Sequence, residues 1–346
     1  MLIRPCGPRR SIVVRFGLVL LALATAVPRA GAATGPEPGQ LEAAAATVWH
    51  VAAQAPGGGD GSPGRPFASI SDALAVAEPG DTVDVGPGDY PGKLRTVRAG
   101  APGAPIRLIG HGAHLHHDGT SRLLQIDHDH VHVEGFELSG ANILITISAA
   151  QGVVIAGNAL HDAGSECLRL RDGASFNLVA RNWIRNCGVT DFTADRLVGE
   201  GIYVGTAPEN TGGERDASLA NAIDGNDIAV PGECVDIKEG ADGTVVQNNT
   251  CIGSRYENSA GIASRARWTL VRWNVSTGHA GAGVMLAGDR PGDGVDNMVI
   301  ENVLVANAGY GLKVVDGPQL RLCGNRLEGN GRAPTTPAGA GADLPC

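Results

Sequence analysis

The segment Glu233-Cys-Val-Asp-Ile-Lys238 returns, with substitutions, along the second half of the chain and decides the fold. In these six-residue segments the third and fifth positions are nearly all aliphatic, and the fourth and sixth are mostly charged or small. A β-strand points alternate side chains to opposite faces, so positions three and five are predicted to face a core and positions four and six to face solvent. The other segments are Glu166-Cys-Leu-Arg-Leu-Arg171, Glu200-Gly-Ile-Tyr-Val-Gly205, Ala260-Gly-Ile-Ala-Ser-Arg265, Ala282-Gly-Val-Met-Leu-Ala287 and Tyr310-Gly-Leu-Lys-Val-Val315.

A second repeat runs through the same region and consists of an aliphatic residue, two variable positions and Asn. Its period is close to that of the six-residue segments, apart from one interval, Asn182 to Asn226, that is nearly twice as long. A period of roughly 23 residues with short alternating strands predicts an all-β fold, a parallel β-solenoid in which each repeat forms one coil. Asn tolerates the left-handed backbone of tight turns, and stacked Asn side chains can hydrogen-bond along a ladder. The long interval holds either one coil with extra loop or two short coils. The Asn residues of the repeat are Asn158, Asn182, Asn226, Asn249, Asn274, Asn302 and Asn325.

Stacked coils bring residues that are distant in sequence into contact. Equivalent positions on successive coils are expected roughly 4.8 Å apart, the spacing of neighbouring strands. The alignment therefore predicts one interior row made of the third positions of the six segments. These are Leu168, Ile202, Val235, Ile262, Val284 and Leu312.

Composition agrees with a fold of many turns and few helices. The 346 residues include 51 Gly and 20 Pro, and 43% are hydrophobic, which is too apolar for a disordered chain. Gly shows no three-residue period, which excludes collagen, and the Gly and Pro content argues against a helix bundle.

Residues 1–32 have the features of a secretory signal peptide. Arg4, Arg9, Arg10 and Arg15 precede the apolar run 16–27, and Ala30-Gly31-Ala32 supplies small residues for cleavage. Residues 33–47 are predicted to be a linker and residues 48–346 the β-helix domain. No other segment has the ~20 apolar residues that a membrane-spanning helix needs. We therefore expect a secreted protein, extracellular or periplasmic, and a monomer.

The mature chain is acidic. Removal of the signal peptide takes five Arg and no acid from the 27 basic and 36 acidic residues. Such a surface does not favour nucleic acid as a partner, because phosphate binding depends on clustered Lys and Arg. An anionic substrate requires a local basic patch.

Six cysteines remain in the mature chain. An oxidising compartment favours disulfides, and the cysteines lack the CxxC spacing of a zinc site. Short-range pairing predicts three disulfides, 167–187, 234–251 and 323–346, which join Cys167, Cys187, Cys234, Cys251, Cys323 and Cys346.

The N-terminal end of the domain is predicted to carry a short capping helix. Residues 66–77 have helical apolar spacing, with Ser69 or Ser71 as the N-cap. Pro79-Gly80-Asp81 ends this pattern, and Thr82–Val85 is predicted to be a strand. A solenoid needs its open end covered, and a short amphipathic helix can do so. From about residue 331 the tail is predicted to be loop.

The N-terminal third resembles the start of right-handed parallel β-helix proteins of the pectin-lyase-like superfamily. The resemblance lies in Ala55-Pro-Gly-Gly-Gly-Asp-Gly61, Pro66-Phe-Ala-Ser-Ile70, Pro79-Gly-Asp-Thr-Val83 and Gly86-Pro-Gly-Asp-Tyr90. It implies a single-stranded right-handed parallel β-helix over most of the mature chain. It says little about chemistry, because one fold hosts many functions.

A narrower resemblance concerns Glu233-Cys-Val-Asp-Ile-Lys238 and the following Val246-Gln-Asn-Asn-Thr250. Together they are similar to the segment of the alginate and chondroitin-B lyases, polysaccharide lyase family six, that carries the catalytic Lys. The resemblance implies Lys238 as general base, and Arg265 occupies the column of the family's Arg one coil later. It also implies calcium ligands, with Glu233 matching one of them and Glu200 standing where the family has Asn. Pro231 departs from the pattern, because the family has a second acid there.

The outward positions of neighbouring coils gather charge on this acidic protein. Cleavage of a polyuronide by β-elimination needs a base, a group that neutralises the uronate carboxylate and an acid for the leaving oxygen. Lys238 and Arg265 are predicted to project side by side, and the guanidinium is expected to favour the neutral amine of Lys238. A solvated charged face without function is the competing interpretation. The predicted substrate-binding residues are Arg169, Arg171, Tyr203, Asp236 and Arg267.

Glu166, Glu200 and Glu233 form a second predicted column. Carboxylates about 5 Å apart repel each other unless a proton, a base or a cation lies between them. Calcium, held by Glu200 and Glu233, is one solution, and pairing with the arginines is the other. We expect no other cofactor.

A histidine-rich stretch invites a metal interpretation. Side chains two apart on a strand lie roughly 7 Å from each other, which is too far for one zinc ion without help from another coil. The simpler interpretation is a set of solvent-exposed histidines on the solenoid face. The stretch comprises His111, His114, His116, His117, His128, His130 and His132.

The sequence thus favours a secreted polysaccharide lyase that cleaves a uronic-acid-containing polymer by β-elimination. A non-catalytic β-helix, either glycan-binding or structural, is the alternative, and a uronate epimerase would share the proton-abstraction step.

Overall fold

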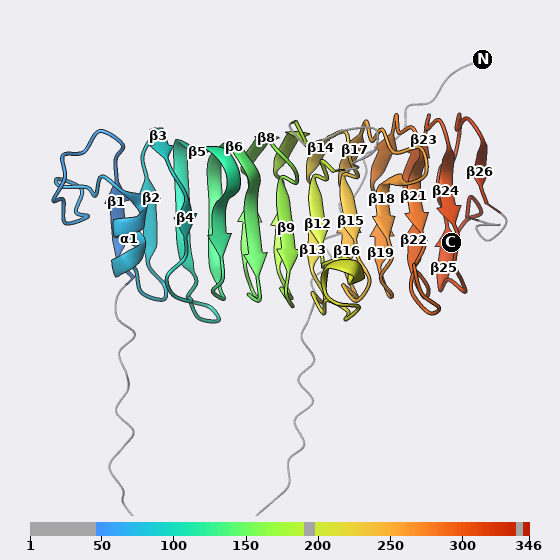
Figure 1. The fold of residues 1–346 in the computed structure, drawn as a ribbon, viewed down its shortest axis with the longest axis horizontal. Helices are drawn as coiled ribbons and strands as arrows, with labels where there is room; N and C mark the ends of the chain where they lie inside the picture. Colours follow the sequence, from blue (N-terminus) through green and yellow to red (C-terminus); the bar gives the residue numbers. More distant parts are fainter. Residues whose placement is uncertain (1–45, 190–197, 337–341) are drawn as a thin grey trace, which may run out of the picture. The chain divides into compact units, whose positions relative to one another are not determined.

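The computed structural model describes residues 46–189, 198–336 and 342–346 (Figure 1). The predicted signal peptide and nearly all of the predicted linker lie outside the described residues. Within the described part of the chain, no helix is long and apolar enough to cross a membrane.

The described chain forms a parallel β-solenoid of about ten turns, as predicted (Figure 1). Its strands stack in three columns, and the pairings between named strands are parallel. The long strands β5 (Ile106–Ile126) and β6 (Val131–Ser148) run round the coil and contribute to all three columns.

The first column contains β1 (Val48–Val51), β2 (Thr82–Val85), β7 (Val154–Ala156), β10 (Leu178–Ala180), β13 (Ala222–Asp224), β16 (Val245–Gln247), β19 (Leu270–Arg272), β22 (Met298–Ile300) and β25 (Arg321–Cys323). The second contains β3 (Gly88–Pro91), β8 (Ala159–Ala163), β11 (Trp183–Cys187), β14 (Asp227–Ala229), β17 (Thr250–Ile252), β20 (Val275–Thr277) and β23 (Val303–Val305). The third contains β4 (Leu94–Arg95), β9 (Leu168–Arg171), β12 (Ile202–Val204), β15 (Val235–Ile237), β18 (Ala260–Ser264), β21 (Ala282–Leu286), β24 (Tyr310–Val314) and β26 (Ala333–Thr335).

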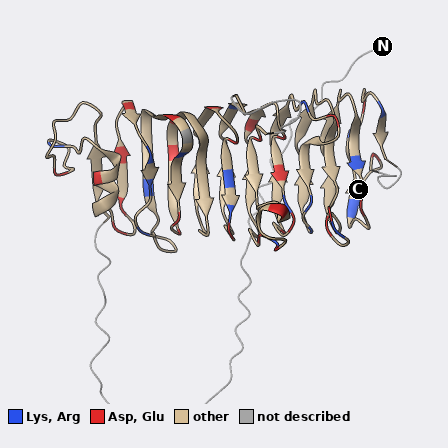
Figure 2. Ribbon diagram, in the orientation of Figure 1, with Lys and Arg blue, Asp and Glu red and all other residues tan. Residues whose placement is uncertain are grey.

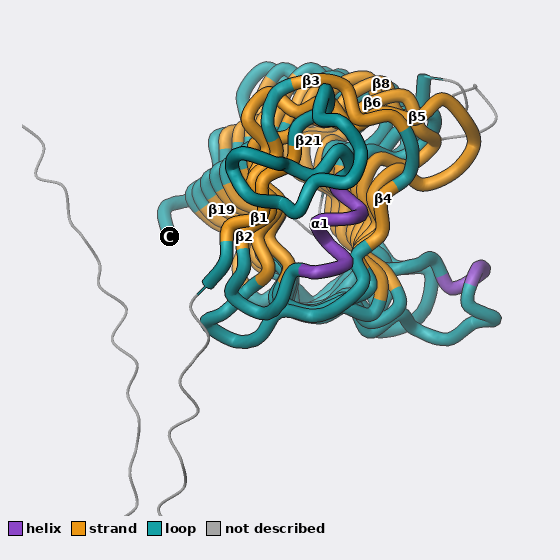
Figure 3. The backbone as a smooth tube through the Cα atoms, turned by 90° about the vertical axis from the view of Figure 1, so that its left-hand side faces the viewer, coloured by secondary structure: helices purple, strands orange, loops and turns teal. Residues whose placement is uncertain are grey.

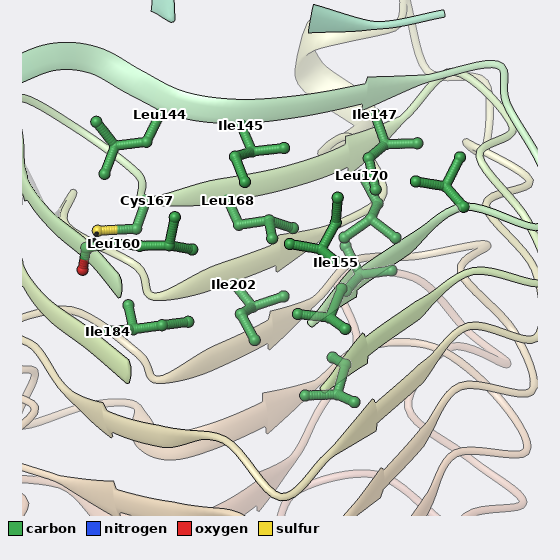
Figure 4. Packing of buried hydrophobic residues seen from close by; sticks show 14 of the residues in the cluster. Leu144, Ile145, Ile147, Ile155, Leu160, Cys167, Leu168, Leu170, Ile184 and Ile202 are labelled. Atoms are coloured by element: carbon green, nitrogen blue, oxygen red, sulfur yellow. Dashed lines mark hydrogen bonds between the residues drawn. The ribbon is translucent and has the colours of Figure 1, made fainter. Parts of the chain in front are cut away.

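The interior row predicted from the sequence is confirmed. Leu168 pairs with Ile202, which pairs with Val235, and the register continues through the remaining members in the predicted order. All of these side chains are fully buried. Figure 4 shows Ile145, Leu168 and Ile202 stacked on successive coils. Like side chains above like side chains leave little void, which is what a close-packed interior requires.

The Asn residues of the second repeat form a buried ladder. The backbone N–H of each Asn donates to the side-chain oxygen of the next: Asn158 N lies 3.0 Å from Asn182 Oδ1, and the later steps measure 2.8–3.0 Å. Asn182 bonds directly to Asn226, so the long interval is one coil with extra loop. The additional loop includes a short 3-10 helix, Pro208–Asn210.

The left-handed backbone at this corner belongs to the residue before the ladder Asn. Arg181, Asn248, Trp273 and Glu301 all have φ between 53° and 58° there. The ladder Asn therefore contributes hydrogen bonds rather than the positive φ that the sequence suggested, because its side chain must point inward to reach the next coil.

The N-terminal end is covered as predicted. Helix α1 (Ile70–Val76) begins after Ser69, whose hydroxyl accepts hydrogen bonds from the backbone N–H groups of Ser71 and Asp72. The helix buries Ile70 and Leu74 and lies across the end of the coil (Figure 3). Strand β2 has the predicted bounds.

The three predicted disulfides are present. Cys167–Cys187 and Cys234–Cys251 each tie a strand of the second column to the start of the third, and Cys323–Cys346 holds the C-terminal end against β25. Each bridge closes a short loop, which restricts the unfolded chain.

Replacing one ladder residue tests the contribution of the ladder to stability. Asn249→Ala should lower the free energy of unfolding by about 2–3 kcal/mol, because the buried Asn226 backbone N–H and Ile223 carbonyl on the preceding coil lose their side-chain partner. Urea denaturation measures this change. The matched control is Asn258→Ala, an exposed position where we expect less than about 0.5 kcal/mol. Equal effects at the two positions would contradict the structural role of the ladder.

Candidate functional site

The candidate site lies on the outward face of the third column, where β12, β15 and β18 are neighbours. The register places Tyr203 beside Asp236 and Asp236 beside Ala263. Lys238 and Arg265 each follow the last residue of their strand, on adjacent coils. In Figure 2, blue marks basic residues on β9 and red marks an acidic residue on β15, two strands of this column. The structure thus brings the predicted catalytic pair together, in the predicted column.

Asp236 is the centre of the site. Its carboxylate bridges both cations, with Lys238 Nζ 2.7 Å from Oδ2 and Arg265 Nη1 2.7 Å from Oδ1. The Asp236 side chain is only 2% exposed, and those of Lys238 and Arg265 are 14% and 19% exposed. These outward positions were expected to face solvent. They are largely buried instead, because the three charged side chains pack against one another and Lys238 lies against the ring of Tyr203.

The pKa of Lys238 is shifted in the direction opposite to the one that the sequence suggested. Burial and the nearby Arg265 both lower the pKa of Lys238, but the Asp236 carboxylate outweighs them and the pKa is raised. Asp236 likewise raises the pKa of Arg265. Burial alone would raise the pKa of Asp236, and the two cations hold it below its usual value. In the ligand-free protein Lys238 is therefore an ammonium, not the neutral amine that the sequence suggested.

Glu200 and Glu233 lie beside this bridge, and neither forms a salt bridge with a basic side chain among the described residues. Carboxylate oxygens of Glu200, Glu233 and Asp236 are all within 4.8 Å of one another. Burial, followed by the charge of Asp236, raises the pKa of Glu233 to about 7, although a hydrogen bond from Ser259 opposes the shift. Burial and then the charge of Glu233 raise the pKa of Glu200 well above its usual value.

Glu166, the third member of the predicted carboxylate column, pairs with an arginine, which was the alternative to a shared cation. Its Oε1 lies 3.7 Å from Arg169 Nη2. Arg169 also stacks over the ring of Tyr203, with Cζ 4.5 Å from the ring centroid, and Lys238 Nζ lies 5.0 Å from the same centroid. The predicted binding residues Arg169, Tyr203 and Asp236 therefore contact the predicted catalytic pair directly or through one ring, and of these three only Asp236 lines the pocket described below.

Arg171 and Arg267 are placed differently. Arg171 pairs with Asp172 at 2.9 Å, two coils away from Lys238. Arg267 lies past the end of β18, where it pairs with Asp296 at 3.4 Å and stacks over Trp268. Neither residue lines the pocket of the candidate site. Their roles in substrate binding stay predictions.

A pocket of about 600 Å³ opens over the bridge. The Tyr256 hydroxyl in its wall donates to the Val198 carbonyl at 2.8 Å. The sequence does indicate a longer loop here, because the stretch from Asn249 to Ala260 is longer than the equivalent stretch from Asn274 to Ala282 on the next coil. The longer coil supplies one wall of the pocket. The wall is a loop that sequence reasoning missed, and its lining residues are Arg255, Tyr256, Glu257, Asn258 and Ser259.

Comparisons with known proteins place the fold. No protein-family model and no curated protein matches the chain. Among solved structures, the chain is similar to an alginate lyase from Paenibacillus sp. str. FPU-7, with a TM-score of 0.67 and 22% identity over 83% of this chain and 99% of that one. It is also similar to pectate lyase Pel9A, with a TM-score of 0.54 and 15% identity over 79% and 77% of the two chains.

A third similar structure is a mannuronic acid specific family 6 polysaccharide lyase from human gut microbiota. Its TM-score is 0.57 and its identity 15%, over 81% of this chain and 64% of that one. These likenesses confirm the parallel β-helix fold. At such identities they show the fold and leave the chemistry to the site, and a lacto-N-biosidase from Eubacterium ramulus shares the fold at a TM-score of 0.58.

The bridge predicts a large effect of removing its carboxylate. Asp236→Asn should lower the free energy of unfolding by about 3 kcal/mol, because two largely buried cations lose their counter-charge. Urea denaturation of Asp227→Asn is the matched control. Asp227 is a half-exposed carboxylate paired with Arg185, and the expected change there is below about 1 kcal/mol. A change at Asp236 no larger than that at Asp227 would contradict the buried bridge.

The raised pKa of Glu233 predicts a pH dependence of stability. The folded protein binds a proton more tightly than the unfolded chain, so this contribution is fully present below pH 4.5 and is lost as the pH rises through about 7. In EDTA, the stability of the wild type relative to Glu233→Gln should fall by on the order of 1–3 kcal/mol between pH 5 and 7.

The matched control for this experiment is Glu328→Gln. Glu328 is exposed and its pKa is lowered by hydrogen bonding to Arg326, so no such fall is expected between pH 5 and 7. A flat difference between wild type and Glu233→Gln over the same range would show that Glu233 ionises normally.

Proposed function

We propose that the protein is a secreted polysaccharide lyase that cleaves a uronic-acid-containing polymer by β-elimination. The observation that carries the proposal is the buried Asp236 carboxylate, which holds Lys238 and Arg265 side by side in an open pocket. The folds of three polysaccharide lyases support it. Three disulfides fit an exported chain.

The charge of the pocket suits an anionic sugar. Lys238 and Arg265 carry two positive charges against the single charge of Asp236, and the raised pKa values of Glu200 and Glu233 favour their neutral forms. Protonated, or neutralised by a cation, these two acids leave a net positive centre. A uronate carboxylate is attracted to this centre, although the protein as a whole is acidic.

In the proposed reaction Lys238 Nζ removes the proton from the carbon beside the uronate carboxylate. The electron pair of the broken C–H bond forms a C=C double bond, the bond to the glycosidic oxygen breaks, and that oxygen takes up a proton. Arg265 neutralises the substrate carboxylate as the carbanion develops, or assists the leaving oxygen. Arg169 and Tyr203, stacked beside Lys238, hold its side chain toward the pocket.

Glu200 and Glu233 fit a calcium ion by donor type. Glu200 Oε2 is buried without a hydrogen-bond partner among the described residues, and oxygen ligands are those that calcium prefers. Both oxygens of Asp236 are engaged by the two cations, so Glu200 and Glu233 are the residues that would hold the ion. Calcium there would add positive charge for the substrate carboxylate.

Lys238 variants test the proposal. Ultraviolet absorbance of unsaturated products, over a panel of alginate, pectate, glucuronan and glycosaminoglycans with EDTA or calcium, should reveal cleavage of one polymer. Lys238→Ala should reduce the rate at least about 10²-fold. Lys238→Arg should reduce the rate by a similar factor, because a guanidinium does not lose its proton and cannot act as the base. The positive charge that bridges to Asp236 is kept in this variant. The wild-type rate should rise toward alkaline pH, since Asp236 raises the pKa of Lys238.

Lys93→Ala, at an exposed position on the N-terminal coils, is the matched control and should cleave normally. Near-normal turnover by Lys238→Arg would overturn the assignment of the base. Saturable binding of a uronate polymer without any unsaturated product would favour the non-catalytic, glycan-binding alternative.

A further inference from the structure

A cluster of three possible metal ligands lies on the second strand column, apart from the candidate site. Asp89 comes from β3, and His114 and His116 come from the following coil, on β5. The register pairs Asp89 directly with His114. One ligand atom from each residue lies within 4.8 Å of the others. Two histidines on one strand are too far apart to form a zinc site without a ligand from another coil. Asp89 is such a ligand.

We propose that Asp89, His114 and His116 bind a zinc ion. The separation of the first two ligand atoms already suits zinc, because His114 Nδ1 lies 3.1 Å from Asp89 Oδ1. Ligand atoms bound to one tetrahedral zinc ion at its usual bond lengths lie about 3.3 Å apart. The strands therefore hold these two groups at the spacing that the ion needs.

His116 completes the set from the same face of β5. Its ring stacks on that of His114 with centroids 4.8 Å apart and planes inclined by 29°, so the two imidazoles lie closer than two outward side chains of a strand usually do. Both rings are only partly exposed. One nitrogen of His116 already lies within 4.8 Å of the other two ligand atoms and is the third ligand, and water takes the fourth position of an open site.

His114 also has the outer partner that zinc-bound histidines use. Its Nε2 lies 2.8 Å from Ser139 Oγ on β6. With zinc on Nδ1, the proton is on Nε2 and is donated to the Ser139 hydroxyl, which fixes the ring orientation. The site thus spans three successive coils, and the ion would cross-link β3 to β5 near the N-terminal cap.

A neighbouring pair of histidines provides the contrast. His50 Nδ1 and His111 Nε2 bind opposite oxygens of Asp84, at 3.0 and 2.8 Å, so the carboxylate separates the two imidazoles. Asp84, His50 and His111 are therefore strung in a row and, unlike the Asp89 cluster, do not offer three ligand atoms within 4.8 Å of one another. His111 is therefore a matched control on the same strand.

The test is calorimetric titration of the untagged mature chain with zinc chloride alone. Wild type should bind one zinc ion per chain. His116→Ala and Asp89→Asn should each weaken binding at least about tenfold, while His111→Ala should bind as wild type does. Zinc should also raise the melting temperature of wild type and not that of His116→Ala. Equal melting temperatures of wild type and variants without zinc establish that the variants fold.

Three results would overturn the proposal: no saturable zinc binding by wild type, unchanged affinity in both His116→Ala and Asp89→Asn, or loss of binding in His111→Ala. A parallel titration with calcium separates this site from the acidic pair, because imidazole ligands do not favour calcium. Calcium binding that survives His116→Ala and disappears in Glu200→Gln belongs to the candidate active site and leaves the zinc proposal unaffected.

Discussion

The register between successive coils is the constraint on which the rest of the structure depends. From β7 onward each coil pairs with the next residue for residue, and the buried Asn ladder ties these coils together from Asn158 to Asn325. A slip of one residue would turn the interior row outward and expose its aliphatic side chains. The same register brings Asp236 of one coil within reach of Arg265 of the next. The register between coils therefore determines both the packing of the interior and the geometry of the candidate site.

The site holds a doubly paired carboxylate that is almost completely buried. A buried carboxylate is costly unless it is paired, and Asp236 is paired twice. The bridge fixes the positions of Lys238 and Arg265 but also stabilises the ammonium form of Lys238. A base held in this way must release Asp236 or a proton before it acts. The electrostatic cost of the arrangement is consistent with selection for a function rather than for stability alone.

The repetitive part of the molecule could be predicted from sequence because each coil carries the same local signal. The interior row through Leu168 and Val235 and the pairing of the six cysteines followed from period and spacing. The departures arose where a tertiary contact overrides the local pattern. Asp236 occupies an outward strand position and is nevertheless buried, with Lys238 and Arg265 each 2.7 Å from one of its two oxygens. Arg267 lies just after the strand and turns away to Asp296 and Trp268, which alternation alone does not reveal.

The most direct test of this account is a crystal structure of the Lys238→Arg protein with an oligosaccharide of the polymer that the wild type cleaves. The account predicts a uronate carboxylate bound to Arg265, with the carbon beside it facing residue 238 and the sugar ring in the pocket beside the Tyr256 loop. An oligosaccharide bound on another face of the solenoid, with the Asp236 pocket empty, would contradict it.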